Sequence, residues 1–214
     1  MEYNTLMPFV LTILAVLIVL VANEIWYRKK ALHDEFSRKF IHITVGSFVA
    51  FWPFFLSWEQ IQILSLAFLI AIGISKAFNI FQAIHSVQRP TWGEVYFAVA
   101  VGLIALFTEE KWVYTAALLQ MSLADGLAAV IGTKYGRRHK YLVFGHPKSL
   151  IGTATFFIVS FAVLVSLNSF FPTELGLLTI LGISLVATFL ENIFVMGLDN
   201  LLVPLFVALV LTKA

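Results

Sequence analysis

The chain has 214 residues, of which 60% are hydrophobic and 12% are charged, and its mean hydropathy is +0.93. Soluble domains are roughly 45–50% apolar, so this composition excludes an ordinary soluble domain and indicates a polytopic membrane protein. The formal net charge of +2 is too small to indicate a nucleic-acid-binding protein, and the absence of cysteine excludes disulfide and thiol chemistry.

Eight apolar runs follow one another along the chain, and each is expected to be a helix because a segment in lipid must satisfy its backbone hydrogen bonds internally. The runs are Leu6–Ala22, Phe40–Leu56, Ile61–Ile84, Val95–Phe107, Trp112–Ile131, Leu150–Phe171, Leu175–Leu190 and Leu198–Leu211. Val95–Phe107 and Leu198–Leu211 are shorter than the ~20 residues of a full span. The sequence therefore predicts an all-α polytopic membrane protein with seven or eight transmembrane helices, forming a single domain over residues 1–214.

The distribution of Lys and Arg predicts the orientation, because cytoplasmic loops are enriched in these residues. The first run follows Glu2 and lacks a basic segment before it, so it is not expected to be a cleaved signal peptide. With the N-terminus outside, the cytoplasmic side holds Arg28, Lys29, Lys30, Arg38, Lys39, Arg89, Lys134, Arg137, Arg138, Lys140 and Lys148, whereas the other side holds Lys111 and Lys213. The five histidines fall on or just inside the cytoplasmic side, as do Glu94, Asp125, Glu191 and Asp199, so we expect an active site at the cytoplasmic boundary. A transporter would instead place ionisable groups near the bilayer midplane.

The stretch "SLADGLAAVIGTKYG" places a carboxylate, Asp125, inside an apolar helix. Small and polar positions recur there at steps of three and four, which puts them on one helix face. For the glycines alone, close helix packing is the simpler interpretation. It does not account for Asp125, which would cost about 2.5–3.5 kcal/mol at the bilayer centre. A carboxylate at this position is expected to meet a metal ion, a basic partner or a water-filled cavity.

The next segment is basic and ends in "GHPKSLIGT". Taken alone, it is typical of a loop that contacts anionic lipid headgroups. Lys148 and Ser149, however, lie at the start of the next helix, where backbone N–H groups and the helix dipole favour anions. The pair is therefore a candidate phosphate site, although the spacing of a Walker A loop is missing.

The order of Asp125-Gly126, Gly132, Gly136, a basic loop, Lys148-Ser149 and Gly152 resembles the CTP-binding region of the dolichol kinase, phytol kinase and CTP-dependent diacylglycerol kinase family. That family is in turn similar to the phosphatidate cytidylyltransferases. Three further segments extend the likeness over most of the chain: "SRKFIHITVG", "RPTWGEVYF" and "ENIFVMGLDNLLVP". One departure is the apolar pair Leu150–Ile151, where some branches carry an acidic residue, and it bears on the lipid substrate more than on the nucleotide.

The resemblance implies a site for CTP and a divalent cation, which we expect to be Mg²⁺. The implied nucleotide-binding residues are Gly132, Gly136, Arg137, Arg138, Lys148, Ser149 and Gly152. Phosphoryl transfer needs positioning and charge neutralisation, and Mg²⁺ prefers oxygen ligands, so the candidate metal ligands are Asp125, Glu191 and Asp199. The alternatives are an N-cap role for Asp199 and an ion pair with a loop cation for Glu191.

The catalytic candidates are Arg38, His42 and Asp125. Arg38 and His42 are four residues apart and share a helix face, so Arg38 is a candidate for phosphate binding and His42 for positioning or deprotonating the lipid hydroxyl. Asp125 is an equal contender for the proton, which leaves open whether it binds metal or acts as the base. The further candidates are Arg89, Glu94 and Asn200, with an Arg89–Glu94 ion pair as the simpler role for Glu94.

We therefore expect an enzyme of the bilayer that phosphorylates a membrane lipid alcohol, such as phytol, polyprenol, dolichol or diacylglycerol, with CTP to give the monophosphate. The nearest alternative is a cytidylyltransferase that forms a CDP-lipid, but "GLDNLL" stands where that family carries a longer signature. A small membrane transporter or a lipid-binding scaffold is the alternative from another class. No nucleic-acid partner is expected.

Overall fold

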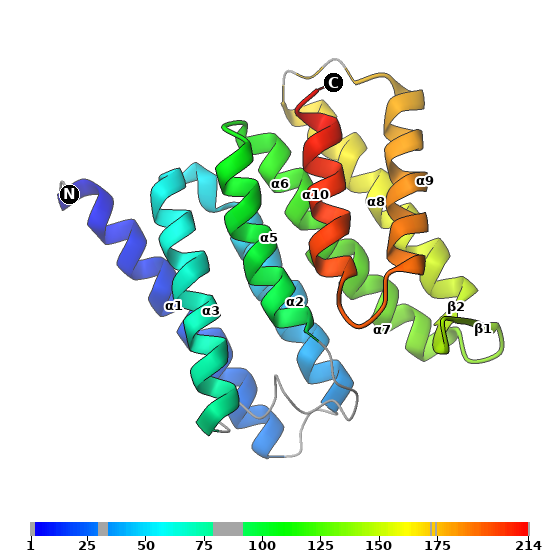
Figure 1. Cartoon of the computed structure of the whole chain (residues 1–214), viewed down its shortest axis with the longest axis horizontal. Helices are drawn as coiled ribbons and strands as arrows, with labels where there is room; N and C mark the ends of the chain where they lie inside the picture. The colour runs from blue at the N-terminus through cyan, green and yellow to red at the C-terminus, as the bar shows by residue number, and fades with distance from the viewer. Residues whose placement is uncertain (1–2, 30–33, 79–91, 172, 174, 214) are drawn as a thin grey trace.

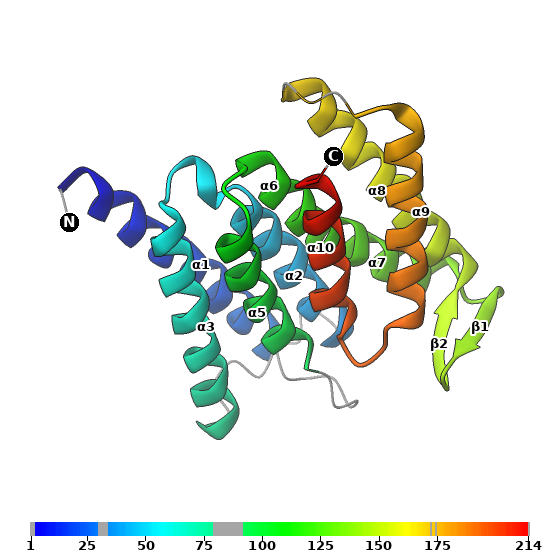
Figure 2. The same cartoon turned by 45° about the horizontal axis from the view of Figure 1, so that its top comes forward.

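A computed structural model describes residues 3–29, 34–78, 92–171, 173 and 175–213. The helices are α1 (Tyr3–Arg28), α2 (Asp34–Ala50), α3 (Trp58–Phe78), α5 (Gly93–Phe107), α6 (Lys111–Leu119), α7 (Asp125–Tyr135), α8 (Leu150–Phe170), α9 (Leu177–Ile193) and α10 (Asp199–Leu211). They form a bundle that runs from α1 and α3 at one side, through α5 and α10, to α8 and α9 at the other (Figures 1 and 2). The prediction of a mainly helical protein is confirmed.

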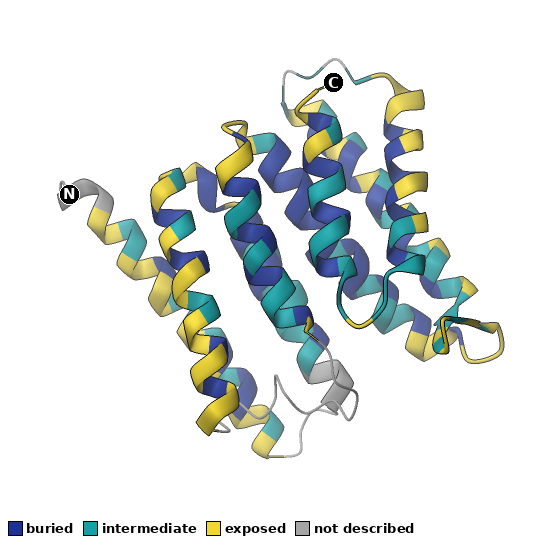
Figure 3. Ribbon diagram, in the orientation of Figure 1, coloured by how far each residue is buried: buried dark blue, intermediate teal, exposed yellow. Residues whose placement is uncertain are grey.

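Four helical segments are long and apolar enough to cross a membrane: Leu6–Arg28, Trp58–Phe78, Lys111–Tyr135 and Leu150–Phe170. The segment Lys111–Tyr135 forms the centre of the bundle, since 72% of its most apolar window is buried, compared with 17% for the first segment. Figure 3 shows the same contrast between the exposed α1 and the buried middle of the molecule. The apolar helices α5, α9 and α10 are shorter.

The predicted run Phe40–Leu56 is wrong as a single helix. Helix α2 ends at Ala50, and a 3₁₀ turn over Trp52–Phe54 follows before α3 begins at Trp58. Pro53 lies in this turn, and proline has no N–H for the helical ladder. The chain therefore reverses at Pro53 instead of continuing as helix to Leu56.

The central segment is not a regular α-helix along its whole length. Helices α6 and α7 are joined by a π-turn over Gln120–Ala124, in which hydrogen bonds span five residues instead of four. The N–H of Asp125 accordingly reaches the carbonyl of Gln120. Such turns are frequent at functional sites, and this one comes directly before Asp125.

A β-hairpin forms in the basic segment for which no secondary structure was predicted, so the expectation of an all-α chain needs correction. Strands β1 (Lys140–Val143) and β2 (His146–Ser149) pair antiparallel, with Val143 opposite His146. The two connecting residues, Phe144 and Gly145, have positive φ values of 47° and 80°, the backbone that a tight hairpin turn requires. The hairpin delivers Ser149 to the start of α8.

Two close approaches of backbone bring the elements of the site together. Helix α7 lies against the start of α8, where a Cβ on Gly132 would come within 2.8 Å of Ser149 Oγ and 3.0 Å of Gly152 Cα. The loop before α10 lies on the start of α5, where a Cβ on Gly197 would come within 2.6 Å of Gly93 Cα. Gly197 also has a φ of +89°, so both its conformation and its surroundings require glycine.

Candidate active site

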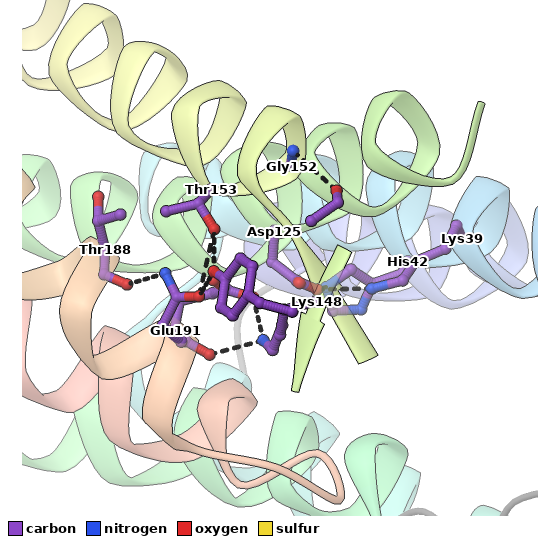
Figure 4. Close-up of polar contacts among 11 residues, drawn as sticks. Lys39, His42, Asp125, Lys148, Gly152, Thr153, Thr188 and Glu191 are labelled. Atoms are coloured by element: carbon purple, nitrogen blue, oxygen red, sulfur yellow. Dashed lines mark hydrogen bonds and ion pairs between the residues drawn. The ribbon is translucent and has the colours of Figure 1, made fainter. Parts of the chain in front are cut away.

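A polar cavity of about 530 Å³ lies where α2, α7, β2, α8, the end of α9 and the start of α10 meet. It gathers residues that are far apart in the sequence (Figure 4). The predicted residues that line it are Arg38, Asp125, Gly132, Lys148, Ser149, Gly152, Glu191, Asp199 and Asn200. The structure thus brings together most of the predicted site at one end of the helices.

Three carboxylates converge in this cavity. One oxygen from each of Asp125, Glu191 and Asp199 lies within 4.8 Å of the others. Asp125 and Glu191 are 8% and 6% exposed, so bulk water screens the repulsion between their charges only weakly. Three carboxylates so close together can all stay ionised only if cations compensate their charges.

The predicted N-cap alternative for Asp199 is wrong. Leu198 occupies the cap position, and Asp199 is the first residue inside α10. Its Oδ1 atom is buried and has no hydrogen-bond partner among the described residues. A buried carboxylate oxygen without a partner is costly, which makes Asp199 the member of the cluster most in need of a ligand.

Two lysines supply part of the compensating charge. Lys39 Nζ on α2 donates to Asp125 Oδ2 at 2.8 Å, and both side chains are buried. Lys148 Nζ on β2 forms an ion pair with the Glu191 carboxylate and donates to the Glu191 carbonyl at 2.7 Å. The ion pair expected for Glu191 with a loop cation is therefore present. Burial alone lowers the Lys148 pKa, but the Glu191 carboxylate outweighs it, and the Lys148 pKa rises above its ordinary value.

Lys39 was not among the predicted site residues. It was counted among the basic residues that set the orientation, and it lies in "SRKFIHITVG", one of the segments that carry the family resemblance. Its partner Asp125 is 86 residues away, and no local pattern connects them. The available signals were its place in that segment and its position three residues before His42, which puts it close to the same helix face.

His42 contacts the π-turn instead of pointing freely into the cavity. Its Nε2 lies 2.8 Å from the Met121 carbonyl and 3.4 Å from Asp125 Oδ2. A carbonyl only accepts hydrogen bonds, so Nε2 carries the proton and donates it to Met121. In this arrangement Nε2 cannot accept a proton from a substrate, and His42 contacts both the π-turn and Asp125.

A second network holds the hairpin against α8 and α9. The Tyr141 hydroxyl lies 2.6 Å from Thr153 Oγ1 and donates to Asn192 Oδ1, and Asn192 Nδ2 donates to the Thr188 carbonyl at 3.0 Å. Asn192 is next to Glu191 in α9. The network therefore fixes β1 and β2 in the position that lets Lys148 reach Glu191 (Figure 4).

The glycine-rich face is closely packed. A Cβ on Gly132 or Gly136 would collide with neighbouring atoms of α7 or the α8 N-terminus, and a Cβ on Gly152 would make tight contacts with Ser149 Oγ and the Ala128 carbonyl oxygen. Ser149 is the N-cap of α8, with its hydroxyl accepting from the Gly152 N–H at 3.1 Å. Gly132, Ser149 and Gly152 still line the cavity, so the close packing also keeps that wall open.

Some predicted residues lie elsewhere. Arg137 and Arg138 are exposed beyond the end of α7, and neither they nor Gly136 are among the described residues that line the cavity. Glu94, in the first turn of α5, borders a separate cavity. Arg89 lies outside the described residues, and so does its predicted pairing with Glu94. In their place, Lys140, His146 and Thr153 line the polar cavity.

The residues present suit a magnesium ion. Mg²⁺ takes oxygen ligands and is usually held by one or two carboxylates together with waters and substrate phosphates. The cluster offers carboxylate oxygens from Asp125, Glu191 and Asp199, of which Asp199 Oδ1 is buried and without a partner among the described residues. The cavity thus has the carboxylates for a cation and the lysines for an anionic partner.

The chain is similar to curated proteins of one kind. It is 33% identical over 202 residues to a phytol kinase of Synechocystis sp., an alignment that covers 90% of this chain and 84% of that protein. It is 28% identical to probable phytol kinase 1, chloroplastic, of Glycine max and 27% identical to probable phytol kinase, chloroplastic, of Triticum aestivum, of which it covers 66% and 68%. No protein-family model and no solved structure matches the chain.

Proposed function

The chain belongs to the phytol kinase family, and on this premise we propose that it phosphorylates an isoprenoid alcohol of the phytol type with CTP and Mg²⁺. The products are the alcohol monophosphate and CDP. The single observation that carries the proposal is the polar cavity, in which two buried carboxylates and the half-buried Asp199 meet Lys39 and Lys148.

The charge arrangement suits phosphoryl transfer. In this reaction the protein mainly positions the two reactants and neutralises negative charge on the transferred group. Lys148, with Ser149 and the start of α8, would face the phosphates, because a helix N-terminus favours anions. A magnesium ion held by Glu191 and Asp199 would neutralise charge on the phosphates and leave the Asp125 carboxylate to act on the alcohol.

Asp125 has the position to act on the alcohol. Lys39 and His42 contact it from α2, and Glu191 and Asp199 each place a carboxylate oxygen within 4.8 Å of it. The alcohol oxygen attacks the terminal phosphorus of CTP, its O–H bond breaks, and the proton passes to the Asp125 carboxylate. The bond between that phosphorus and the bridging oxygen breaks, and the electron pair leaves with CDP.

We also propose that the protein spans the membrane several times, with seven or eight crossings, its N-terminus outside and the cavity at the cytoplasmic boundary. Four long apolar helices and three shorter ones support several crossings. The Lys and Arg residues of the hairpin region lie at the same end of the bundle as the cavity, which supports this orientation.

The direct test uses the purified protein in nanodiscs with Mg²⁺, phytol and CTP labelled at either the α- or the γ-phosphate. The proposal predicts γ label in the lipid product and none from the α position. Label from the α position would instead indicate a cytidylyltransferase. If neither label enters the lipid while a known phytol kinase is active under the same conditions, the proposed function is wrong.

The same assay defines the donor and the acceptor. Replacing CTP by ATP or UTP should lower the rate, and polyprenol, dolichol and diacylglycerol are to be compared with phytol.

Lys148→Ala should raise the KM for CTP by at least about 10-fold, in line with the loss of a charged hydrogen bond. Arg138→Ala, which removes an exposed cation outside the cavity, is the matched control and should change that KM much less.

A further inference from the structure

A second cavity, of about 280 Å³, lies between the pair α1–α2 and the pair α3–α5. We call it the apolar groove. Its walls come from all four helices and include Val16, Leu20, Val45, Phe68, Ile72 and Phe97. These side chains offer dispersion contacts and no hydrogen bonds, so the groove is suited to a hydrocarbon ligand.

The apolar groove ends at the polar cavity. Arg38, Lys39 and Asn200 line both spaces. Lys39 contacts Asp125 at 2.8 Å, and Asn200 is held in place by donating from Nδ2 to the Gly93 carbonyl at 3.1 Å. A ligand with an apolar chain and one polar end could therefore place the polar end beside Asp125 while its chain stays in the groove.

The opposite rim of the groove faces outward. Ile13 and Leu17 on α1 are 36% and 45% exposed, and Ala67 and Ala71 on α3 are also exposed while lining the groove. Both helices are long and apolar enough to cross a membrane. In a bilayer this rim meets lipid, which gives a hydrocarbon chain a lateral route into the groove.

We propose that the apolar groove binds the isoprenoid chain of the alcohol substrate and presents its hydroxyl at the junction of Arg38, Lys39 and Asn200. This inference rests on the proposed function and adds the site that selects the alcohol. Ligand pockets usually enclose about 300–1,000 Å³, and the groove, at about 280 Å³, lies just below that range. It therefore holds the part of the chain next to the hydroxyl, and the remainder extends along the exposed rim into lipid.

Filling the groove tests the proposal. Ala71→Phe adds a ring inside the groove, and Ala77→Phe adds the same ring to an exposed position of α3 that is not among the described groove residues. The measured quantity is the ratio of kcat/KM for phytol to that for prenol, a short isoprenoid alcohol that needs little of the groove. We expect Ala71→Phe to lower this ratio at least 10-fold and Ala77→Phe to leave it within twofold of wild type.

Two further measurements keep the outcome clear. Ala67→Leu is a smaller change in the same wall and should lower the ratio in the same direction if Ala71→Phe does not fold. A photoreactive phytol analogue should label α1, α2, α3 or α5 in the wild-type protein. An unchanged ratio in both groove variants, or labelling confined to other helices, overturns the groove while phytol kinase activity persists. The absence of phytol kinase activity in the wild-type protein would instead overturn the proposed function.

Discussion

The polar cavity and the apolar groove share three residues but are built in opposite ways. In the polar cavity, charged groups are paired over long sequence separations, Lys39 with Asp125 and Lys148 with Glu191. Its glycine-lined wall depends on close backbone contact between α7 and α8. The apolar groove is formed by larger aliphatic and aromatic side chains, and part of its rim is exposed.

Under the proposed function, this difference would hold the nucleotide and the alcohol in separate spaces that meet at Arg38, Lys39 and Asn200. A nucleotide requires fixed charges and hydrogen-bond donors, which must be held by a rigid frame because each unpaired charge is costly in a buried site. A flexible hydrocarbon chain requires only apolar surface. Changes in the polar cavity should therefore affect chemistry or stability strongly, whereas changes in the groove should alter the choice of alcohol.

The largest effect is expected for Asp125→Asn. The amide keeps the shape of the side chain but removes the charge that Lys39 and the proposed cation require, so kcat for phytol should fall by about 100- to 1,000-fold, the loss typical of one group that stabilises a transition state. The γ-label assay measures it. Circular dichroism and gel filtration must show wild-type folding. Activity within a few-fold of wild type would remove Asp125 from the chemistry.

The second effect concerns the cation. Magnesium should raise the thermal midpoint of the protein in detergent, since a ligand present at 100 times its Kd stabilises the folded state by about 2.7 kcal/mol. Asp199→Asn should abolish most of this shift. Glu94→Gln is the matched control, because Glu94 lies outside the polar cavity. An equal magnesium shift in all three proteins would contradict a metal site at the carboxylate cluster.

A third prediction compares the stability effect of adding a methyl group in the packed wall, at Gly132, with that of adding one on an open helix surface, at Gly73. In Gly132→Ala the new methyl group would lie 2.8 Å from Ser149 Oγ and 3.0 Å from Gly152 Cα, and overpacking of this kind costs about 1–3 kcal/mol. In Gly73→Ala nothing among the described residues lies within 4 Å, so the better helix propensity should stabilise α3 by roughly 0.5–1 kcal/mol. Thermal midpoints that move in the same direction would contradict this contrast.

The smallest effect is expected for Tyr141→Phe. This change removes the hydroxyl that joins β1 to Thr153 and Asn192, at a cost of about 0.5–1.5 kcal/mol for a typical hydrogen bond. The hairpin should then hold Lys148 less firmly, and the KM for CTP should rise a few-fold with little change in the phytol-to-prenol ratio. A change in that ratio without a change in the KM for CTP would place Tyr141 with the alcohol instead.

The carboxylate cluster was predictable because charged residues inside apolar runs are costly. Each of the three residues, Asp125, Glu191 and Asp199, interrupts or borders an apolar run. The distribution of Lys and Arg between the loops predicted that all three lie on one side of the membrane. Their convergence within 4.8 Å confirms that they lie together. Their roles as metal ligands remain predictions.

Other features were hidden from the sequence for physical reasons. The strands of the hairpin are four residues long, and their connecting residues are Phe144 and Gly145 instead of the Asn-Gly or Asp-Gly pair that marks such turns. Lys39 was not predicted as a site residue because only tertiary packing brings it to its partner Asp125. Pro53 could have predicted the end of α2 near Ala50. The predicted run extended to Leu56 because the residues after Ala50 are also mostly apolar.

The π-turn has a consequence for how this chain tolerates change in length. A residue added to a helix rotates everything beyond it by about 100°, since a turn holds about 3.6 residues. The π-turn over Gln120–Ala124 absorbs such an added residue locally, so α6 keeps its buried face while Asp125 faces Lys39. Deleting one residue there could restore a continuous α-helix and leave its composition almost unchanged. It would nevertheless turn Asp125 away from its partners, so in this segment the residue count is as much a part of the site as the side chains.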